Sequence, residues 1–286
     1  MRKVNGHFLI LIAAVFWSTA GLFTRIVTTD IPTTLFWRSF FGGLTVLIIV
    51  LSFRRSTDLW GAFQFTRGEV IISTLSTAGM ICFISSFFYT SIANVSFIYG
   101  TMPLVTYLLS LLILRDKSNL IAWLCCILST FGVLIITAGN SEFDDYLGIT
   151  LAFGMTFFMA TLTVATKFYP TVDTLKSTYL SAFLGALIMI PFADFQAVTI
   201  PDYGWLWLYG VFNVGLGFGV YLLGVERVTA LAAALIGLVE IPLAPIFAWF
   251  LFSEKVNQQT IIGGIIILAS VTIYIFNNGR KKGIAT

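Results

Sequence analysis

Long apolar stretches alternate with short polar links along the whole chain. Each stretch is about as long as the roughly 20 residues that an α-helix needs to cross the hydrocarbon core of a bilayer. The pattern predicts ten membrane-spanning helices, and breakers such as Pro32, Pro170 and Pro201 fall in the links between them. The approximate centres of the ten spans are Val15, Thr45, Met80, Val105, Leu128, Phe157, Gly185, Phe212, Ile241 and Leu268.

The basic residues are distributed unevenly between the two sides that this pattern defines. Ten spans place both ends of the chain on one side, and short cytoplasmic links are enriched in Lys and Arg. The opposite links hold only Arg25 and Lys255, and Arg38 lies inside a span. We therefore expect both termini to be cytoplasmic. The basic residues on that side are Arg2, Lys3, Arg54, Arg55, Arg67, Arg115, Lys117, Lys167, Lys176, Arg227, Arg280, Lys281 and Lys282.

The composition agrees with an all-α integral membrane protein. Hydrophobic residues make up 58% of the chain and charged residues 10%, whereas soluble domains have about 45–50% and 25%. We expect the lipid bilayer as the surroundings, no nucleic-acid partner and no separate soluble domain. Cys82, Cys125 and Cys126 lie inside apolar stretches without a nearby His or acidic residue at metal-ligand spacing, so they are interpreted as packing residues. No metal and no cofactor is predicted.

The two halves of the chain resemble each other weakly. A shift of 142 residues aligns the first span, up to Arg25, with the sixth, up to Lys167. The segments that begin at Pro103 and Pro242 form a second echo near the end of each half. Because each half contains five spans, an odd number, the halves must enter the membrane in opposite directions. We therefore predict two inverted five-helix repeats, 1–140 and 141–286, an arrangement typical of transporters that hold substrate at the bilayer midplane.

Two charged residues lie within otherwise apolar spans. Arg38 is one to two turns from the start of the second span, and Glu240 is near the middle of the ninth. A charge at membrane depth usually faces a cavity and marks a functional site. The guanidinium can bind a substrate carboxylate through two hydrogen bonds, while Glu240 can take up an ammonium group or a coupling proton. The alternative is that Arg38 and Glu240 pair with each other and only hold helices together.

Several other residues within spans are candidates for the same site. Prolines inside a helix remove a hydrogen bond and kink it, so Pro103, Pro242 and Pro245 are predicted to shape a cavity, or else only the packing. Indole and phenol groups inside a span need polar partners and can surround a cation or an aromatic substrate, although packing alone also explains them. The aromatic candidates are Trp17, Trp37, Tyr89, Tyr99 and Tyr107.

The chain resembles the EamA-type proteins of the drug/metabolite transporter superfamily. The resemblance depends on Phe16-Trp17-Ser18 and Arg38, on Tyr89-Thr90-Ser91 with Pro103 and Arg115-Asp116, and on Glu240-Ile241-Pro242 with Ser253-Glu254. It covers nearly the whole chain. Asp116 departs from the pattern, because family members commonly have Glu there. The resemblance implies a central cavity lined by spans 1–4 and 6–9, peripheral spans 5 and 10, and alternating access for small metabolites such as amino acids.

These observations predict a secondary transporter of the prokaryotic cytoplasmic membrane, and no enzyme. We expect an amino acid or a related amine-bearing metabolite as substrate, moved by exchange with a counter-substrate or by proton coupling. The protein is expected to be a monomer or a homodimer. An exporter of hydrophobic cations or drugs is the alternative within transport. A structural membrane subunit is the alternative outside it, although such a subunit has no need of a buried Arg38 and Glu240.

Overall fold

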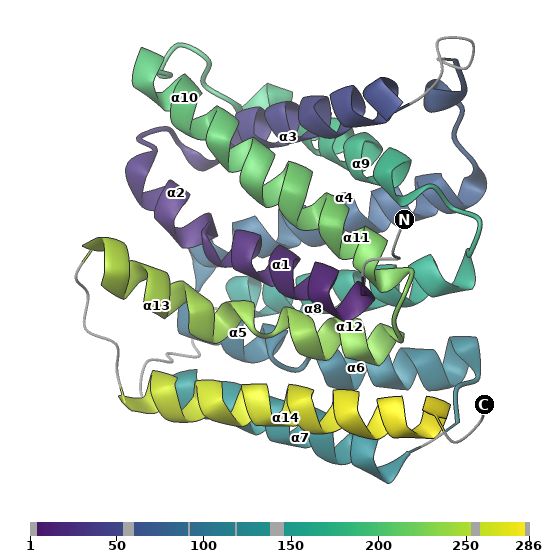
Figure 1. Ribbon diagram of the computed structural model, residues 1–286. Helices are drawn as coiled ribbons and strands as arrows, with labels where there is room; N and C mark the ends of the chain where they lie inside the picture. Colours follow the sequence, from purple (N-terminus) through teal and green to yellow (C-terminus); the bar gives the residue numbers. More distant parts are fainter. Residues whose placement is uncertain are drawn as a thin grey trace.

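The chain folds into a bundle of membrane-spanning helices that lie side by side (Figure 1). The structure, a computed structural model, describes residues 5–53, 60–90, 92–117, 119–137, 146–252 and 258–283. A short helix, η2 (Trp60–Phe63), precedes the third span. In chain order the spans are α1 with α2 (Gly6–Ser18, Ala20–Ile26), α3 (Ile31–Phe53), α4 (Arg67–Tyr89), α5 with α6 and η3 (Ile92–Tyr99, Met102–Leu109, Ser110–Leu114), α7 (Leu120–Thr137), α8 (Tyr146–Phe168), α9 with η4 (Thr174–Met189, Ile190–Phe192), α10 with η5 and α11 (Ile200–Tyr209, Gly210–Phe218, Gly219–Val225), α12 with α13 (Ala230–Gly237, Glu240–Phe252), and α14 (Gln258–Gly283).

The prediction of ten spans is confirmed. Within the described residues, seven helices are long and apolar enough to cross a membrane, and three shorter apolar helices complete the set. The shorter ones are Gly6–Ser18, Leu120–Ile136 and Ala230–Ala244. Two of these three belong to spans in which the helix is interrupted, at Thr19 and at Leu238–Val239. α2 continues the first of these spans to Ile26, and α13 continues the ninth to Phe252.

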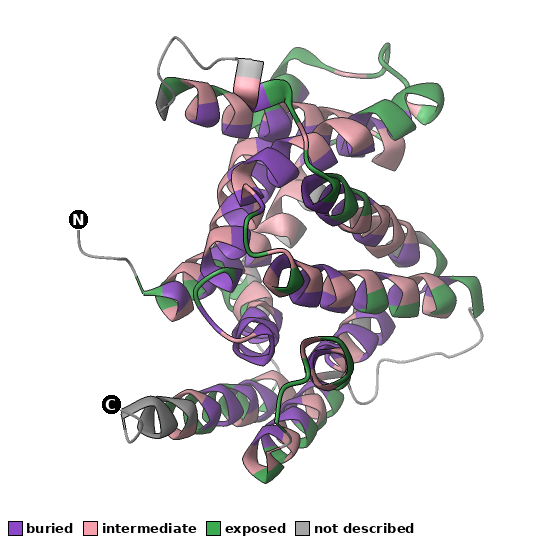
Figure 2. Ribbon diagram, turned by 90° about the vertical axis from the view of Figure 1, so that its right-hand side faces the viewer, coloured by how far each residue is buried: buried purple, intermediate pink, exposed green. Residues whose placement is uncertain are grey.

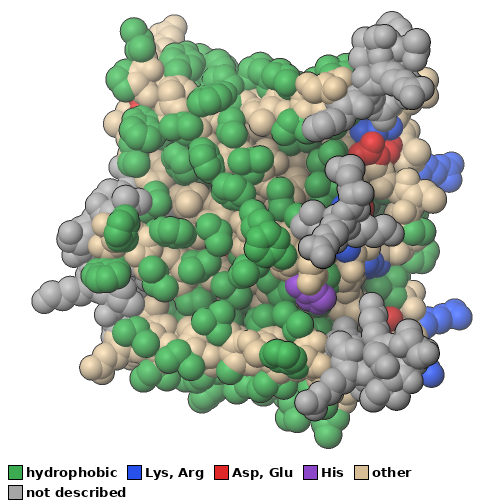
Figure 3. Space-filling model, viewed as in Figure 1, with side chains coloured by type: hydrophobic (Ala, Val, Ile, Leu, Met, Phe, Trp, Pro, Cys, Tyr) green, Lys and Arg blue, Asp and Glu red, His purple; other side chains and the backbone are tan. Residues whose placement is uncertain are grey.

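The two halves of the bundle run in opposite directions, as five spans per repeat require. α1 begins and α14 ends at the same face of the bundle, on the right of Figure 1. Lys and Arg side chains gather along this edge, while hydrophobic side chains cover most of the remaining surface in view (Figure 3). We call this edge the basic face. Its position agrees with the uneven distribution of basic residues along the sequence.

A pair of equivalent helix caps relates the two repeats. The third span of each half begins with a capping box, Thr66 with Glu69 at α4 and Thr199 with Asp202 at α10. The Glu69 carboxylate also accepts a hydrogen bond from the backbone N–H of Asp173, at 3.3 Å, in the link between spans six and seven. The Asp202 carboxylate accepts one from the backbone N–H of Thr28, at 3.1 Å, in the link between spans one and two. The same device therefore closes opposite ends of the bundle.

Serine and threonine side chains join α4 to α9 in the half of the bundle nearest the basic face. The Ser73 hydroxyl donates to the carbonyl of Ser177 at 3.0 Å, and one turn further on the Thr77 hydroxyl donates to the carbonyl of Ser181 at 2.9 Å. At the basic end, Lys176 Nζ lies 3.4 Å from Glu69 Oε1, with both side chains buried. These bonds satisfy polar groups that lipid and apolar packing cannot satisfy.

Glycines bring α3 against η5 in the other half of the bundle. A Cβ atom at Gly210 would lie 2.6 Å from the carbonyl oxygen of Arg38, and one at Gly42 would lie 2.5 Å from Val214 Cβ. Only glycine permits this approach. It places the Arg38 backbone directly against the η5 segment.

Burial separates a packed interior from a lipid-facing surface. Every residue of α12 is buried, and small or branched side chains of α1, α8 and α11 pack against it. The outward faces of the peripheral helices α7 and α14 expose large apolar side chains, such as Leu124 at 55% and Ile265 at 61%. Figure 2 shows buried positions directed inward and exposed ones outward. An apolar exterior of this kind fits a bundle surrounded by lipid.

Candidate functional site

A cavity of about 100 Å³ lies at the centre of the bundle. Its lining residues come from spans 1–4 and 6–9, and α7 and α14 contribute none of them. This is the arrangement that the resemblance implies. The lining consists of Trp17, Ala20, Arg38, Ser76, Gly79, Met80, Phe83, Tyr99, Met155, Met159, Ser181, Ala182, Asn213, Val214, Phe218 and Glu240.

Arg38 reaches the cavity from α3 and is only 7% exposed. Its Nη2 donates a hydrogen bond to the amide oxygen of Asn213 on η5. The guanidinium carbon lies 5.0 Å from the ring centroid of Tyr209, within range of a cation–π interaction. The other two guanidinium nitrogens, Nε and Nη1, are buried without a hydrogen-bond partner. Two donors of the guanidinium are thus unsatisfied within the protein, which is unusual for buried polar groups.

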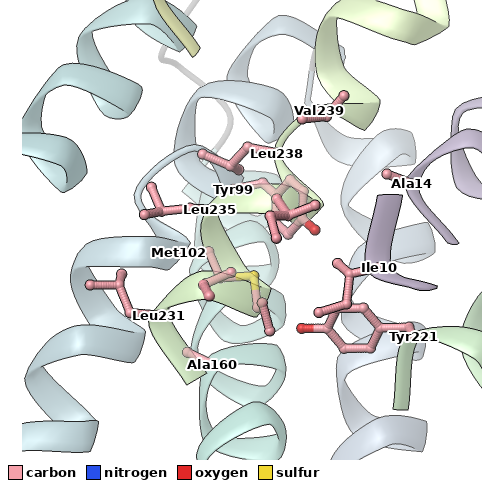
Figure 4. Close-up of a cluster of buried hydrophobic side chains, with 14 of the residues drawn as sticks. Ile10, Ala14, Tyr99, Met102, Ala160, Tyr221, Leu231, Leu235, Leu238 and Val239 are labelled. Carbon is pink, nitrogen blue, oxygen red and sulfur yellow. The ribbon is translucent and has the colours of Figure 1, made fainter. Parts of the chain in front are cut away.

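Glu240 reaches the cavity from the opposite repeat. It is the first residue of α13, directly after the interruption at Leu238–Val239. The interruption redirects the chain, so Glu240 begins a new helix near the middle of the ninth span. Tyr99 and Tyr221 lie close enough to interact electrostatically with its carboxylate. Figure 4 shows these two tyrosines in the buried cluster that also contains Leu235, Leu238 and Val239.

Arg38 and Glu240 form no ion pair in the structure. Both side chains are described, both line the cavity, and no salt bridge within 4.0 Å joins them. This conformation therefore does not show the alternative, in which Arg38 and Glu240 pair with each other and only hold helices together. Instead, one cationic and one acidic group, contributed by different repeats, face the same central space.

The structure separates the five aromatic candidates into two groups. Trp17 and Tyr99 line the cavity. Trp37 instead packs among aromatic rings, with Tyr203 at 5.0 Å and Phe195 at 6.2 Å between ring centroids. Tyr89 is 51% exposed at the end of α4.

Tyr107 has a structural role away from the cavity. Its hydroxyl accepts a hydrogen bond from the backbone N–H of Asn119 at 2.7 Å, and its ring packs against Trp123 at 5.1 Å. These contacts anchor the start of α7 to α6. The Tyr107 hydroxyl therefore finds its polar partner in the backbone and not in a substrate.

The three prolines differ in their effect on the backbone. Pro103 lies in the first turn of α6, directly after the interruption at Gly100–Thr101. Pro242 lies in the first turn of α13, so two prolines of corresponding spans follow an interruption in the same way. Pro245 lies within α13, where the helix continues. Tyr99 directly precedes the interruption in the fourth span, Glu240 directly follows the one in the ninth, and both line the cavity.

Several residues of the cavity are neither charged nor aromatic and were not predicted from the sequence. Asn213 is the only polar partner of Arg38 among the described residues, and it lies on η5, a nine-residue π-helical segment. Its signal in the sequence was an amide inside an apolar, glycine-rich span. Met80, Met155 and Met159 add a flexible apolar wall. Within the described residues, no group of three His, Cys, Asp or Glu side chains is placed to hold a metal ion.

The chain belongs to the EamA-like transporter family, whose profile matches residues 4–138 and again residues 146–276. It is 26% identical over 278 residues to a protein of Archaeoglobus fulgidus that is named only as an uncharacterized transporter, covering 94% of this chain and 95% of the other. A Bacillus subtilis protein named as the uncharacterized transporter YoaV is 21% identical over 288 residues, covering 96% of this chain and 97% of the other. The family and these relatives indicate a multi-pass membrane transport protein for a small molecule.

Two further matches are to a relative with a named substrate and to a solved structure. A protein of Rickettsia prowazekii named as an S-adenosylmethionine uptake transporter is 21% identical over 251 residues, covering 86% of this chain and 83% of the other. A solved crystal structure matches with a TM-score of 0.83 at 16% identity, covering 96% of this chain and 98% of that one. At this identity the structural match establishes the fold alone.

Proposed function

We propose that this protein is a secondary transporter that carries an amino acid, or a related amine-bearing metabolite, across the cytoplasmic membrane by alternating access. The observation that carries the proposal is that Arg38 and Glu240 line one cavity from different repeats without pairing. We further propose that the repeats are residues 1–140 and 141–286, with the substrate held between them.

The two charges suit the two ends of an amino acid. A guanidinium offers a planar pair of donors that matches a carboxylate, and Arg38 has two buried nitrogens without partners. Glu240 can accept an ammonium group. Trp17, Phe83 and Phe218, with the methionines, supply apolar contact for a side chain. A zwitterion therefore compensates both charges in the cavity at once, which neither a simple amine nor a simple acid does.

A hydrophobic cation is the second candidate. Aromatic rings beside a carboxylate attract a cation, and Trp17 and Phe218 lie 6.0 Å apart between ring centroids on the cavity wall. S-adenosylmethionine, the substrate in the name of the Rickettsia relative, combines an amino-acid group with a sulfonium cation and so shares features of both candidates. The unneutralised Arg38 disfavours a ligand that has only positive charge.

Glu240 is our candidate for coupling. A carboxyl at the centre of the membrane can take up a proton on one side and release it on the other, or it can exchange one amine-bearing ligand for a counter-substrate. The interrupted helix beside it gives the carboxyl access to the cavity. We also propose that the basic face is cytoplasmic, with both termini on that side, because Lys and Arg concentrate in its links.

Uptake into proteoliposomes tests the proposal. Purified protein is reconstituted and assayed with twenty radiolabelled L-amino acids, S-adenosylmethionine and tetraphenylphosphonium, with and without a pH gradient. Uptake of an amino acid above that of empty liposomes supports the proposal, and uptake of tetraphenylphosphonium alone supports the cation alternative. The Arg38→Ala/Glu240→Gln double variant is the control that lacks both charges. Transport of no compound under any gradient or exchange condition contradicts the proposal and favours a structural subunit.

A further inference from the structure

Asn213 is the polar group that holds Arg38. It is the fourth residue of η5 and only 3% exposed. The close approach at Gly42 and Gly210 brings α3 to this segment, and the Arg38 Nη2 donates to the Asn213 amide oxygen. A π-helical segment in a membrane span is uncommon and often marks a functional site. Here it carries the amide into the cavity.

The partner of Arg38 is uncharged, so this contact lacks a negative charge that would neutralise the guanidinium. An amide offers Arg38 a dipole but no negative charge. No carboxylate of the described residues lies within 4.0 Å of the guanidinium, and Tyr209 contributes only its ring face, at 5.0 Å. The positive charge of Arg38 is thus oriented but not neutralised. In a low-dielectric interior such a charge strongly attracts an anion.

We propose that Asn213 is a positioning and specificity-determining residue, which fixes the Arg38 guanidinium while leaving its charge for the anionic group of the substrate to compensate. The inference rests on the proposed function, because it assigns Arg38 to the substrate carboxylate. Asn213 lines the cavity itself, so its amide N–H₂ can donate to the same anion. A carboxylate at this position would occupy Arg38 permanently and compete with the substrate.

The decisive variant is Asn213→Asp, which preserves the shape of the side chain and adds one negative charge. We expect it to raise the KM for the best-transported amino acid at least tenfold, with the maximal rate retained. Transport of the matching decarboxylated amine should be unchanged or improved, because that ligand has no carboxylate to lose. Asn213→Ala should weaken the amino acid less, since the guanidinium keeps its charge but loses its orientation. The control is Gln196→Glu, the same chemical change on the exposed link before α10.

A stability measurement separates failure of this inference from failure of the proposed function. If Arg38 is uncompensated, Asn213→Asp should unfold at a higher temperature in detergent than Asn213→Ala, whatever the substrate. A wild-type protein that transports no amino acid contradicts the proposed function, while this stability order still tests the charge state of Arg38. An unchanged KM in Asn213→Asp, or equal stability of the two variants, overturns the role of Asn213.

Discussion

Arg38 and Glu240 stand on different repeats, in the second and ninth spans, and face one central cavity without an ion pair between them. Each charge is costly to bury, and each would be partly neutralised if the two side chains met. We propose that a ligand with both a negative and a positive group neutralises the two charges at once.

Removal of the acidic charge should affect coupling more than folding. We expect Glu240→Gln to abolish transport, or to make it independent of the pH gradient, while the protein still elutes as a single species. The reason is that an amide keeps the shape of the side chain but cannot take up a proton. Uptake into proteoliposomes between pH 5.5 and 8 measures this. Normal uptake with an unchanged pH profile would leave Glu240 a packing role only.

The glycine contact between α3 and η5 should be sensitive to a single methyl group. Gly210→Ala places a Cβ atom 2.6 Å from the Arg38 carbonyl oxygen. Overpacking of this kind costs about 1–3 kcal/mol, so we expect a lower unfolding temperature and weaker transport. Gly204→Ala, on the same span, is the matched control because no atom lies within 4 Å of its Cβ position. Thermal unfolding in detergent compares the two, and equal stability would contradict the close approach.

Removal of one partner of the buried Lys176–Glu69 ion pair should destabilise the protein more than removal of both. Lys176→Met leaves the Glu69 carboxylate buried without its counter-charge, and such a loss typically costs about 3–5 kcal/mol. The double variant Glu69→Gln/Lys176→Met removes both charges and should be distinctly more stable than the single one. Thermal unfolding of the three proteins tests this. A double variant no more stable than Lys176→Met would argue against the pairing.

The orientation of the bundle can be tested by chemical labelling. In a variant without Cys82, Cys125 and Cys126, a cysteine at Asp194 should react with an impermeant thiol reagent outside intact cells. A cysteine at Lys281 should react only after the membrane is opened, because the basic face is proposed to be cytoplasmic. Reaction at Lys281 in intact cells would reverse the orientation. Glu142 is a second position predicted to be external, and it lies outside the described residues.

The architecture was accessible from the sequence because lipid imposes strong rules on it. Span length follows from bilayer thickness, and Arg38 and Glu240 were conspicuous because charges inside spans are rare. Trp17 and Tyr99 line the cavity as expected of candidates. Trp37, Tyr89 and Tyr107 do not line it, because an aromatic ring inside a span has no feature in the sequence that separates packing from binding.

The remaining parts of the site depend on local geometry that no sequence pattern specified. The interruption at Leu238–Val239 was suggested by Pro242, but the break at Thr19 has no proline nearby. The π-helical η5 is invisible to a periodicity argument, because its glycines and apolar residues also suit an α-helix. Asn213 was missed for that reason: only the register of η5 against α3 brings it to Arg38.

We propose that Arg38 binds the carboxylate of the substrate. Arg38→Lys keeps the charge but loses the planar pair of donors, and loss of a charged hydrogen bond costs about 1.5–3 kcal/mol, roughly 10- to 150-fold in affinity. The most direct measurement is competition against labelled substrate in proteoliposomes by an amino acid and its decarboxylated amine, with wild-type and Arg38→Lys protein. We expect the variant to weaken the amino acid by this factor and to leave the amine nearly unchanged. Equal weakening of both compounds would contradict carboxylate recognition and assign Arg38 to helix packing.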